Sequence, residues 1–233
     1  MKKKYRNEWK YCCTNAELAR IEAKLSALLE KDQHTDNQGR YHIHSLYFDD
    51  LRNTCAWATE AGEAERFKYR IRYYNDDPSF LRLERKEKRD GCGNKESCLL
   101  TRETYRALTE GDVSDYLYDS TQPLLQRFSM DILTRHFTPR LIVDYERVAY
   151  VEPTTNVRIT MDYNISVSRQ LDRFLTGDYL REPLMRKDLH VLEVKFDDIL
   201  PAYIKQCLYE SQLQQRSFSK YFLGFEKYRR MSS

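Results

Sequence analysis

The stretch that decides the fold is KYRIRYYNDDPSFLRLERKEKRDGCGNK, residues 68–95. Its first part alternates cations with apolar residues, the cations being Lys68, Arg70 and Arg72. After a turn the alternation resumes on four charged positions, Arg82, Glu84, Lys86 and Lys88. Because successive side chains of a strand point to opposite faces of a sheet, both segments are predicted as strands with one charged face.

Other segments repeat this pattern, which extends the charged face over a larger sheet. The residues that share one parity are Glu8 and Lys10, then Arg158, Thr160 and Asp162, and then Glu193, Lys195 and Asp197. Tyr145 and Arg147 are an exception, because they share their parity with the apolar Leu141 and Val143.

Two arrangements are compatible with this periodicity. The first is an antiparallel sheet with one face in water. The second is a closed barrel whose charged faces look into a polar tunnel. Burial of so many cations is prohibitive unless each is paired or bound by a multivalent anion, and a polyphosphate-like ligand has the required charge density. The periodicity alone leaves both arrangements open.

The length, composition and net charge of the chain limit the class of protein to which it can belong. A length of 233 residues fits one large domain or two small ones. The chain has no internal repeat and no Gly/Pro-rich linker, so we expect a single α+β domain over residues 1–233. A hydrophobic share of 41% excludes a disordered chain. The net charge is only +3, so the protein is not a broadly basic nucleic-acid coat, and any anion site depends on local segregation of charge.

The location of the protein is predicted to be cytoplasmic. No stretch approaches the ~18 apolar residues of a membrane helix, and MKKKYRNEWKYCC lacks the apolar core of a secretory signal. The six cysteines contain no C-x-x-C pair, so they are expected to be reduced thiols without a zinc site. His42 and His44 could bind a metal from one strand face, but such histidines are more often ordinary polar positions.

Helix and strand signals place these faces along the chain. Thr14 and Glu17 form a capping box for a helix that reaches residue 31. Further helices are expected near 53–60, at 101–110 capped by Thr101, at 122–136 capped by Thr121 with Pro123 in the first turn, and at 200–212 and 217–230. Further strands are expected at 40–50, 139–151, 156–165 and 188–198. Gly91 and Gly93 suit a hairpin turn after the second strand of the opening stretch.

Eight of these segments, in order, carry a resemblance that covers nearly the whole chain: RNEWKY, SLYFDD, KYRIRYY, LRLERKEKRDG, DYERVAY, VRITMD, HVLEVKF and SFSKYFLG. They resemble the VTC domain, the polyphosphate polymerase module of the triphosphate tunnel metalloenzyme (CYTH-like) superfamily. The resemblance implies an eight-stranded antiparallel β tunnel, a closed barrel with flanking helices, whose interior is lined by Arg, Lys and Glu.

The resemblance also implies roles for individual residues. Arg70 and Arg72 resemble the tunnel arginines that grip the nucleotide phosphates, and Lys220 resembles a helix-borne lysine at the tunnel mouth. The remaining phosphate-binding candidates are Lys10, Lys86, Tyr145, Arg147, Arg158, Lys195 and Ser219, with Lys95 aligned more loosely. Glu193 resembles the metal-binding glutamate, and Glu8 and Glu84 are secondary metal or orienting candidates. The catalytic set is expected to be Arg70, Arg72, Lys86, Lys220 and Glu193.

The implied activity is transfer of the γ-phosphoryl group of ATP to a growing inorganic polyphosphate chain, assisted by Mn²⁺ or Mg²⁺. Two alternatives stay open: a tripolyphosphatase or nucleoside triphosphatase of the same fold, and a non-catalytic polyphosphate-binding regulatory module. A membrane-protein partner is implied by related bacterial proteins, but no membrane insertion of this chain is expected. No nucleic-acid partner is expected either, because Tyr69 and Tyr73 lie on the face opposite Arg70 and Arg72.

Overall fold

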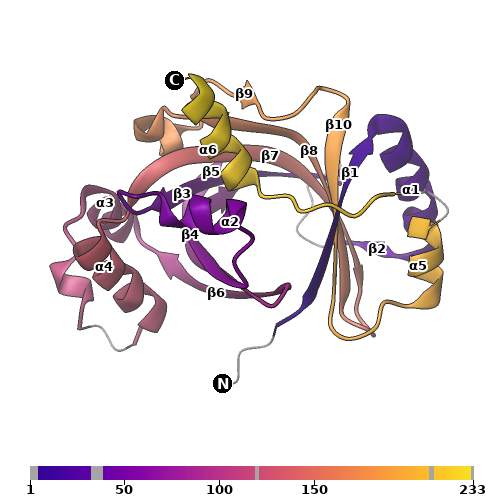
Figure 1. The fold of residues 1–233 in the computed structure, drawn as a ribbon, viewed down its shortest axis with the longest axis horizontal. Helices are drawn as coiled ribbons and strands as arrows, with labels where there is room; N and C mark the ends of the chain where they lie inside the picture. Colours follow the sequence, from indigo (N-terminus) through magenta and orange to yellow (C-terminus); the bar gives the residue numbers. More distant parts are fainter. Residues whose placement is uncertain (1–4, 33–38, 119–120, 210–212, 232–233) are drawn as a thin grey trace.

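An antiparallel sheet of ten strands organises the fold (Figure 1). The computed structural model describes residues 5–32, 39–118, 121–209 and 213–231. The strands are β1 (Asn7–Thr14), β2 (Glu30–Lys31), β3 (Tyr41–Asp49), β4 (Glu65–Tyr74), β5 (Asp77–Arg89), β6 (Cys92–Leu100), β7 (Thr138–Glu152), β8 (Val157–Ser168), β9 (Glu182–Pro183) and β10 (Leu189–Phe196). Eight of them follow the order β1-β10-β8-β7-β3-β4-β5-β6, while β2 pairs with β7 and β9 with β8.

Helices flank the curled sheet, which confirms the α+β class. They are α1 (Asn15–Leu28), α2 (Thr54–Glu60), α3 (Arg102–Glu110), α4 (Pro123–Arg135), α5 (Ala202–Tyr209) and α6 (Lys220–Met231), with short 3₁₀ turns η1 (Ser114–Tyr116) and η2 (Leu171–Thr176). In Figure 1, α3 and α4 lie at one side of the sheet and α1 and α5 at the other. None of the helices described is both long and apolar enough to cross a lipid bilayer.

The closed barrel that the resemblance implies is not confirmed. Among the described residues, the edge strands β1 and β6 meet at one bridge, where Arg6 and Gly93 exchange two backbone hydrogen bonds of 3.0 and 2.9 Å. No continuous ladder joins the two edges along the described chain, so the sheet path stays open. We refer to this contact as the seam.

The apolar faces of the strands point outward and are covered by helices. Tyr69 and Tyr73 of β4 are 0% and 1% exposed. Phe128 of α4 stacks on Tyr69 with ring centroids 4.3 Å apart, and Phe174 of η2 packs edge-on against Tyr73. The alternation along β4 therefore places its tyrosines and its arginines on opposite faces of the sheet. The face with the tyrosines is the outer, convex face, which helices cover.

A second core lies under α1 and α5. Leu18, Ile21 and Leu25 of α1 are buried in one cluster with Val194 of β10 and Ile204 of α5. The predicted capping box at the start of α1 is present, since the Thr14 and Glu17 side chains bond reciprocally to the backbone. These helices hold β1 and β10 in place, and the other face of these two strands carries charges.

Helix α6 packs onto the inner side of β7 and β8 and accounts for the parity exception. A Cβ atom at Gly224 would lie 2.8 Å from Val167 and 3.2 Å from Leu141, so the helix approaches as closely as only glycine permits. Leu141 shares its face with Tyr145 and Arg147. The inner face of β7 and β8 is thus apolar in the part that α6 covers. The part that α6 leaves uncovered is charged.

Several local predictions need correction. Helix α4 begins at Pro123 with Gln122 as its N-cap, so Thr121 is not the cap. The β5–β6 turn consists of Asp90 and Gly91, both with positive φ as an Asp-Gly hairpin requires. Gly93 lies inside β6 rather than in the turn, and β6 itself was not expected. The segment that it occupies has little apolar alternation, because it pairs as an edge strand and only one of its nine residues is buried.

Candidate functional site

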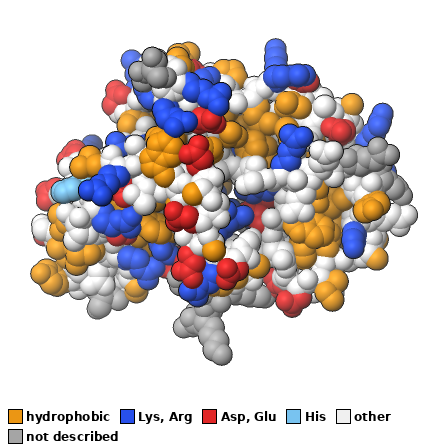
Figure 2. All heavy atoms as spheres, in the orientation of Figure 1, with side chains coloured by type: hydrophobic (Ala, Val, Ile, Leu, Met, Phe, Trp, Pro, Cys, Tyr) orange, Lys and Arg blue, Asp and Glu red, His pale blue; other side chains and the backbone are white. Residues whose placement is uncertain are grey.

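A cavity of about 940 Å³ fills the charged part of the curl. Fourteen lysine and arginine side chains line it, against three carboxylates. The lining has eleven more cations than carboxylates, whereas the whole chain carries only +3, so the rest of the chain is net negative. Figure 2 shows a hollow near the centre of the molecule with Lys and Arg side chains at its edge.

The predicted site residues meet at this cavity. Those that line it are Glu8, Lys10, Arg70, Arg72, Lys86, Lys95, Tyr145, Arg147, Arg158, Glu193, Lys195, Ser219 and Lys220. They come from β1, β4, β5, β6, β7, β8, β10 and α6, so the curl of the sheet is what brings them together. Glu84 is the one predicted residue outside the lining, because it lies behind the arginines of β4.

Glu84 is the centre of an arginine cluster. Arg70 approaches one of its oxygens through Nε at 2.8 Å and Nη2 at 2.6 Å, and Lys95 Nζ lies 3.1 Å from the other. Arg72 Nη1 is 3.6 Å away. Burial opposes ionisation of Glu84, but the two arginines and the lysine hold the pKa of its carboxyl well below the ordinary value. The carboxylate therefore fixes the two guanidinium groups that face the cavity.

Arg72 is oriented by hydroxyl groups as well. Its Nη2 donates to Tyr145 Oη at 3.2 Å and to Ser45 Oγ at 3.4 Å, and its Nη1 donates to Tyr74 Oη at 3.3 Å. Only 4% of Arg72 is exposed. These hydrogen bonds fix the position of the Arg72 guanidinium, with Tyr145 beside it.

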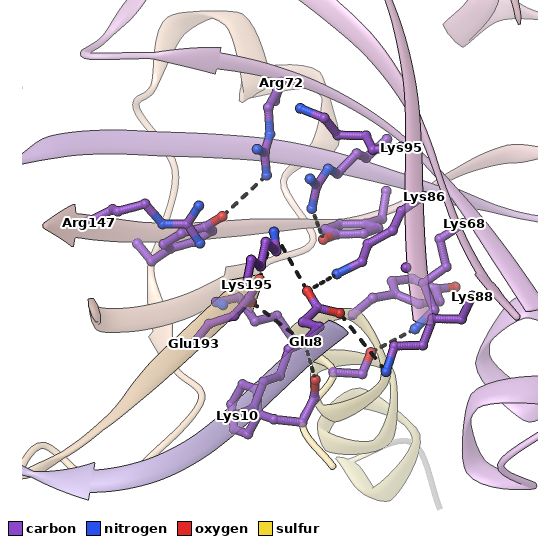
Figure 3. Close-up of a pocket in the computed structure, with 18 of the residues that line it drawn as sticks. Glu8, Lys10, Lys68, Arg72, Lys86, Lys88, Lys95, Arg147, Glu193 and Lys195 are labelled. Atoms are coloured by element: carbon purple, nitrogen blue, oxygen red, sulfur yellow. Dashed lines mark hydrogen bonds and ion pairs between the residues drawn. The ribbon is translucent and has the colours of Figure 1, made fainter. Parts of the chain in front are cut away.

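Glu8 and Glu193 form a second, lysine-rich cluster on the neighbouring strands β1 and β10. In the strand register, Lys10 pairs with Glu193 and Glu8 pairs with Lys195. Lys86 Nζ donates to Glu8 Oε1 at 2.6 Å, and Lys195 Nζ lies 2.7 Å from Glu193 Oε1. Figure 3 shows these side chains converging on the cavity from β1, β5 and β10.

Both glutamates of this cluster ionise readily. Burial opposes ionisation of Glu193, but Lys195, Lys10 and Lys86 hold the pKa of its carboxyl well below the ordinary value. Burial and the negative charge of Glu193 raise the pKa of Glu8, and the three lysines outweigh them so that the net shift is downward. Two carboxylates thus stay charged near each other.

The lysine-rich cluster has the donors that a hard divalent cation needs. Glu8 Oε2 is a buried oxygen without a hydrogen bond, and Glu193 Oε1, which is also buried, contacts Lys195 Nζ at 2.7 Å. Carboxylate oxygens are the preferred ligands of Mg²⁺ and Mn²⁺. The residues present therefore fit such an ion, whereas both oxygens of Glu84 are already engaged by Arg70 and Lys95.

Two further carboxylates bind cavity cations, and neither was expected at the site. Asp162 accepts from Arg147 Nε at 2.6 Å and Nη2 at 2.8 Å, and Lys220 Nζ lies 2.5 Å away. Burial opposes its ionisation, yet Arg147 and Lys220 lower the pKa of Asp162 to about 2. Asp32 pairs with Arg158 at 2.6 Å. In the sequence, the only indication that Asp162 lies at the site is that it shares its strand parity with Arg158.

Lys68 is a cavity lysine of a different kind. Its Nζ donates to Ser219 Oγ at 2.7 Å, and no carboxylate pairs with it among the described residues, unlike Lys10, Lys86, Lys88, Lys95, Lys195 and Lys220. Burial, followed by the charges of Lys10 and Lys86, lowers the pKa of Lys68 to about 7. Ser219 also accepts from Phe222 N at 3.2 Å, so it caps α6 and contacts the cavity at the same time.

Solved structures share this fold at low sequence identity. A Hippeastrum protein described as an adenylyl cyclase with a dominant triphosphatase activity matches with a TM-score of 0.56 and 14% identity, covering 96% of this chain and 95% of that chain. A Bacillus halodurans protein described as an adenylate cyclase matches with a TM-score of 0.50 and 12% identity, covering 94% and 96%. The chain therefore shares its fold with these two proteins.

A sequence search among curated proteins finds no match. The family model of the VTC domain, in contrast, matches residues 5–229. That match spans β1 to α6 and includes every residue described around the cavity. The chain belongs to the VTC domain family.

Proposed function

We propose that this protein is a metal-dependent polyphosphate polymerase, which transfers the γ-phosphoryl group of ATP to an inorganic polyphosphate chain inside the cavity. The observation that carries the proposal is the charge of the lining, fourteen cations against three carboxylates. Such a surface is costly to bury unless a polyanion neutralises it. At about 940 Å³ the cavity is at the upper end of ligand pockets, which suits an elongated anion.

The arginine cluster is proposed to hold the nucleotide phosphates. Arg70 and Arg72 are fixed by Glu84 and by hydroxyl groups, and phosphoryl transfer depends mainly on positioning and on neutralisation of charge. Lys86 and Lys220 are the further catalytic cations in this assignment. Lys10, Arg147, Arg158, Lys195 and Ser219 bind the remaining phosphates, and Tyr145 orients Arg72.

Glu193 and Glu8 are proposed to hold Mn²⁺ or Mg²⁺. When bound, the ion neutralises oxygens of the transferred group. Two neighbouring buried carboxylates, with Glu8 Oε2 left without a hydrogen bond, support this assignment. Lys195 and Lys10 contact Glu193 at 2.7 and 3.8 Å, so they would be the cations nearest to a phosphate bound at such an ion.

The attacking group needs little help from a general base. The terminal phosphate of a polyphosphate chain is already ionised near neutral pH, so no strong proton acceptor has to lie beside it. The described cavity lining offers Arg and Lys for orientation and few carboxylates for proton transfer, which agrees with that chemistry. ADP is the leaving group.

The direct test is incubation of the pure protein with ATP and Mn²⁺, followed by gel separation of long polyphosphate from free phosphate. Long chains are expected with the wild-type protein, and about 10²-fold slower chain formation with Glu193→Gln. Release of free phosphate without chains would overturn the polymerase assignment in favour of a hydrolase. Binding of polyphosphate without turnover under any metal would favour a regulatory module.

Hydrolysis is the second candidate function. Water in place of the terminal phosphate would turn the same residues into a triphosphatase. The description of the Hippeastrum protein, in which triphosphatase activity is dominant, supports this alternative. Tripolyphosphate as the only substrate distinguishes the two, because a hydrolase releases phosphate from it without forming longer chains.

A further inference from the structure

A second polar cluster lies on the outer face of the sheet, away from the cavity. His42 and His44 are on β3, Asp144 lies opposite His44 on β7, and Asp76 is in the turn between β4 and β5. None of these four residues is among those that line the cavity. The cluster therefore takes no part in the proposed reaction.

Asp144 holds one nitrogen of each imidazole. His42 Nε2 bonds to Asp144 Oδ1, and His44 Nδ1 lies 2.9 Å from Asp144 Oδ2. The second oxygen also accepts from Tyr179 Oη at 2.7 Å and from Arg181 Nε at 3.1 Å. A carboxylate that is held in this way fixes the tautomer and the orientation of both rings, as the carboxylates behind metal-bound histidines do.

The remaining nitrogens of the two rings both face Asp76. Asp76 Oδ1 lies 2.9 Å from His44 Nε2 and 3.7 Å from His42 Nδ1. His44 is 0% exposed, and its Nε2 is a buried atom without a directional hydrogen bond. Ligand atoms of a tetrahedral ion with bonds of about 2.0–2.1 Å lie about 3.3 Å apart, a value between these two distances. The Asp76 side chain is 68% exposed, which leaves a route from solvent.

We propose that His42, His44 and Asp76 bind a divalent transition-metal ion of the zinc class, with Asp144 orienting the two imidazoles and water in the fourth position. Imidazole nitrogens favour such ions over Mg²⁺ and Mn²⁺, which prefer oxygen. One potential ligand atom each of His42, His44 and Asp144 also lies within 4.8 Å of the others. Asp76 is the better third ligand, because both oxygens of Asp144 already have partners.

This ion would clamp the β4–β5 turn to β3. The turn is already docked there, since Asn75 N donates to His42 O at 3.1 Å and His42 N donates to Asn75 Oδ1 at 3.0 Å. His44 and Asp144 directly precede Ser45 and Tyr145, the two groups that orient Arg72 on the other face. The proposed site and the arginine cluster thus lie on opposite faces of the same strands, and the bound ion would support the arginine cluster structurally.

The test uses the full chain without a histidine tag, stripped of metal, in a Glu193→Gln background that removes the proposed cavity ion. Titration calorimetry with Zn²⁺ alone and metal analysis after dialysis are expected to give one ion per chain. His42→Ala and Asp76→Asn are each expected to weaken Zn²⁺ binding at least about tenfold. Asn tolerates the left-handed backbone of position 76, so the turn is retained.

Asp178→Asn is the matched control, because its side chain is 89% exposed and pairs only at the surface with Arg173. Its Zn²⁺ affinity should equal that of the parent. Absence of Zn²⁺ binding in the parent, or unchanged affinity in folded His42→Ala, would overturn the proposal. Unchanged affinity in Asp76→Asn alone would overturn its assignment as a ligand. These readouts need no enzyme activity, so they are independent of the proposed function.

Discussion

Two buried carboxylate centres lie at the same cavity, Glu84 behind its arginines and Glu8 with Glu193 in the lining, and they differ in how their oxygens are engaged. Glu84 accepts two hydrogen bonds from Arg70 on one oxygen and one from Lys95 on the other. Glu8 and Glu193 lie on adjacent strands and share Lys195, and Glu8 keeps a buried oxygen without a hydrogen bond. Arginine and lysine donors engage both oxygens of the first centre, whereas the second is contacted by lysines and is the centre proposed to hold a metal ion.

The difference between the two centres shows how a charged interior can be stable and still bind an anion. A fork of guanidinium donors is preorganised and satisfies a carboxylate by geometry, so it suits a fixed scaffold. Lysines are point charges on flexible stems, and they can turn from a carboxylate to an incoming phosphate. The arginine cluster therefore determines shape, and the lysine-rich cluster remains able to exchange partners.

The largest expected effect is that of Arg72→Ala on turnover. Removal of a fixed guanidinium from the proposed nucleotide phosphates should lower kcat about 10³-fold. Steady-state rates with ATP and Mn²⁺ measure this effect. Arg89→Ala is the control, because Arg89 is exposed, pairs with Glu65 and does not line the cavity. Normal turnover by folded Arg72→Ala would remove it from the site.

Glu84→Gln should mainly affect stability. It leaves Arg70 and Arg72 buried without their counter-charge, which costs about 3 kcal/mol of the free energy of unfolding. Urea denaturation followed by circular dichroism measures the loss. A change below about 1 kcal/mol would contradict the view that this centre is a fixed scaffold.

Glu193→Gln should show the reverse behaviour. Its neighbours keep Glu8 as a counter-charge, so the unfolding midpoint should change little, while turnover falls about 10²-fold because a metal ligand is lost. Dependence of the rate on Mn²⁺ concentration is the specific readout. A mutant that keeps the wild-type Mn²⁺ response would show that the ion binds elsewhere.

Lys68→Met should change the pH dependence of binding. The groups facing Lys68 are Lys10, Lys86, Arg66, Cys55, Ser219 and Tyr221. Because its pKa in the folded protein is about 7, below the ordinary 10.5, the neutral form prevails above pH 7. A bound anion favours the charged form, so binding takes up a proton and affinity falls as pH rises above 7, by up to about tenfold per unit.

Titration calorimetry of tripolyphosphate between pH 7 and 9 separates this effect from the ionisation of the ligand, which is the same for both proteins. The affinity of Lys68→Met should depend less steeply on pH than that of the wild type. Equal slopes would contradict a neutral Lys68. The same linkage requires that the contribution of Lys68 to folding become more favourable as pH rises from about 7 to 10.5, since only the unfolded chain then holds the proton.

The sequence predicts which residues share a strand face better than it predicts which parts of the chain pack against that face. The alternation around Arg70 and Arg72 identifies one charged face, but whether that face is inside depends on helices such as α4 that are distant in sequence. The role of Asp162 depends on Lys220, which lies 58 positions away and reaches it only after α6 docks. The seam could not be predicted either, because it joins Arg6 to Gly93, which is distant in sequence.

The seam bears on how an elongated molecule can leave. An unbroken ring would force a long chain to exit end first, so release would slow as the chain grew. Here the ring is fastened by two backbone hydrogen bonds, each worth about 1 kcal/mol net, and by the ion pair between Glu8 and Lys86. If the proposed function holds, an anion that bound Lys86 in place of Glu8 would leave only the two backbone hydrogen bonds across the seam, and a long product would then have a sideways exit as well as the two ends.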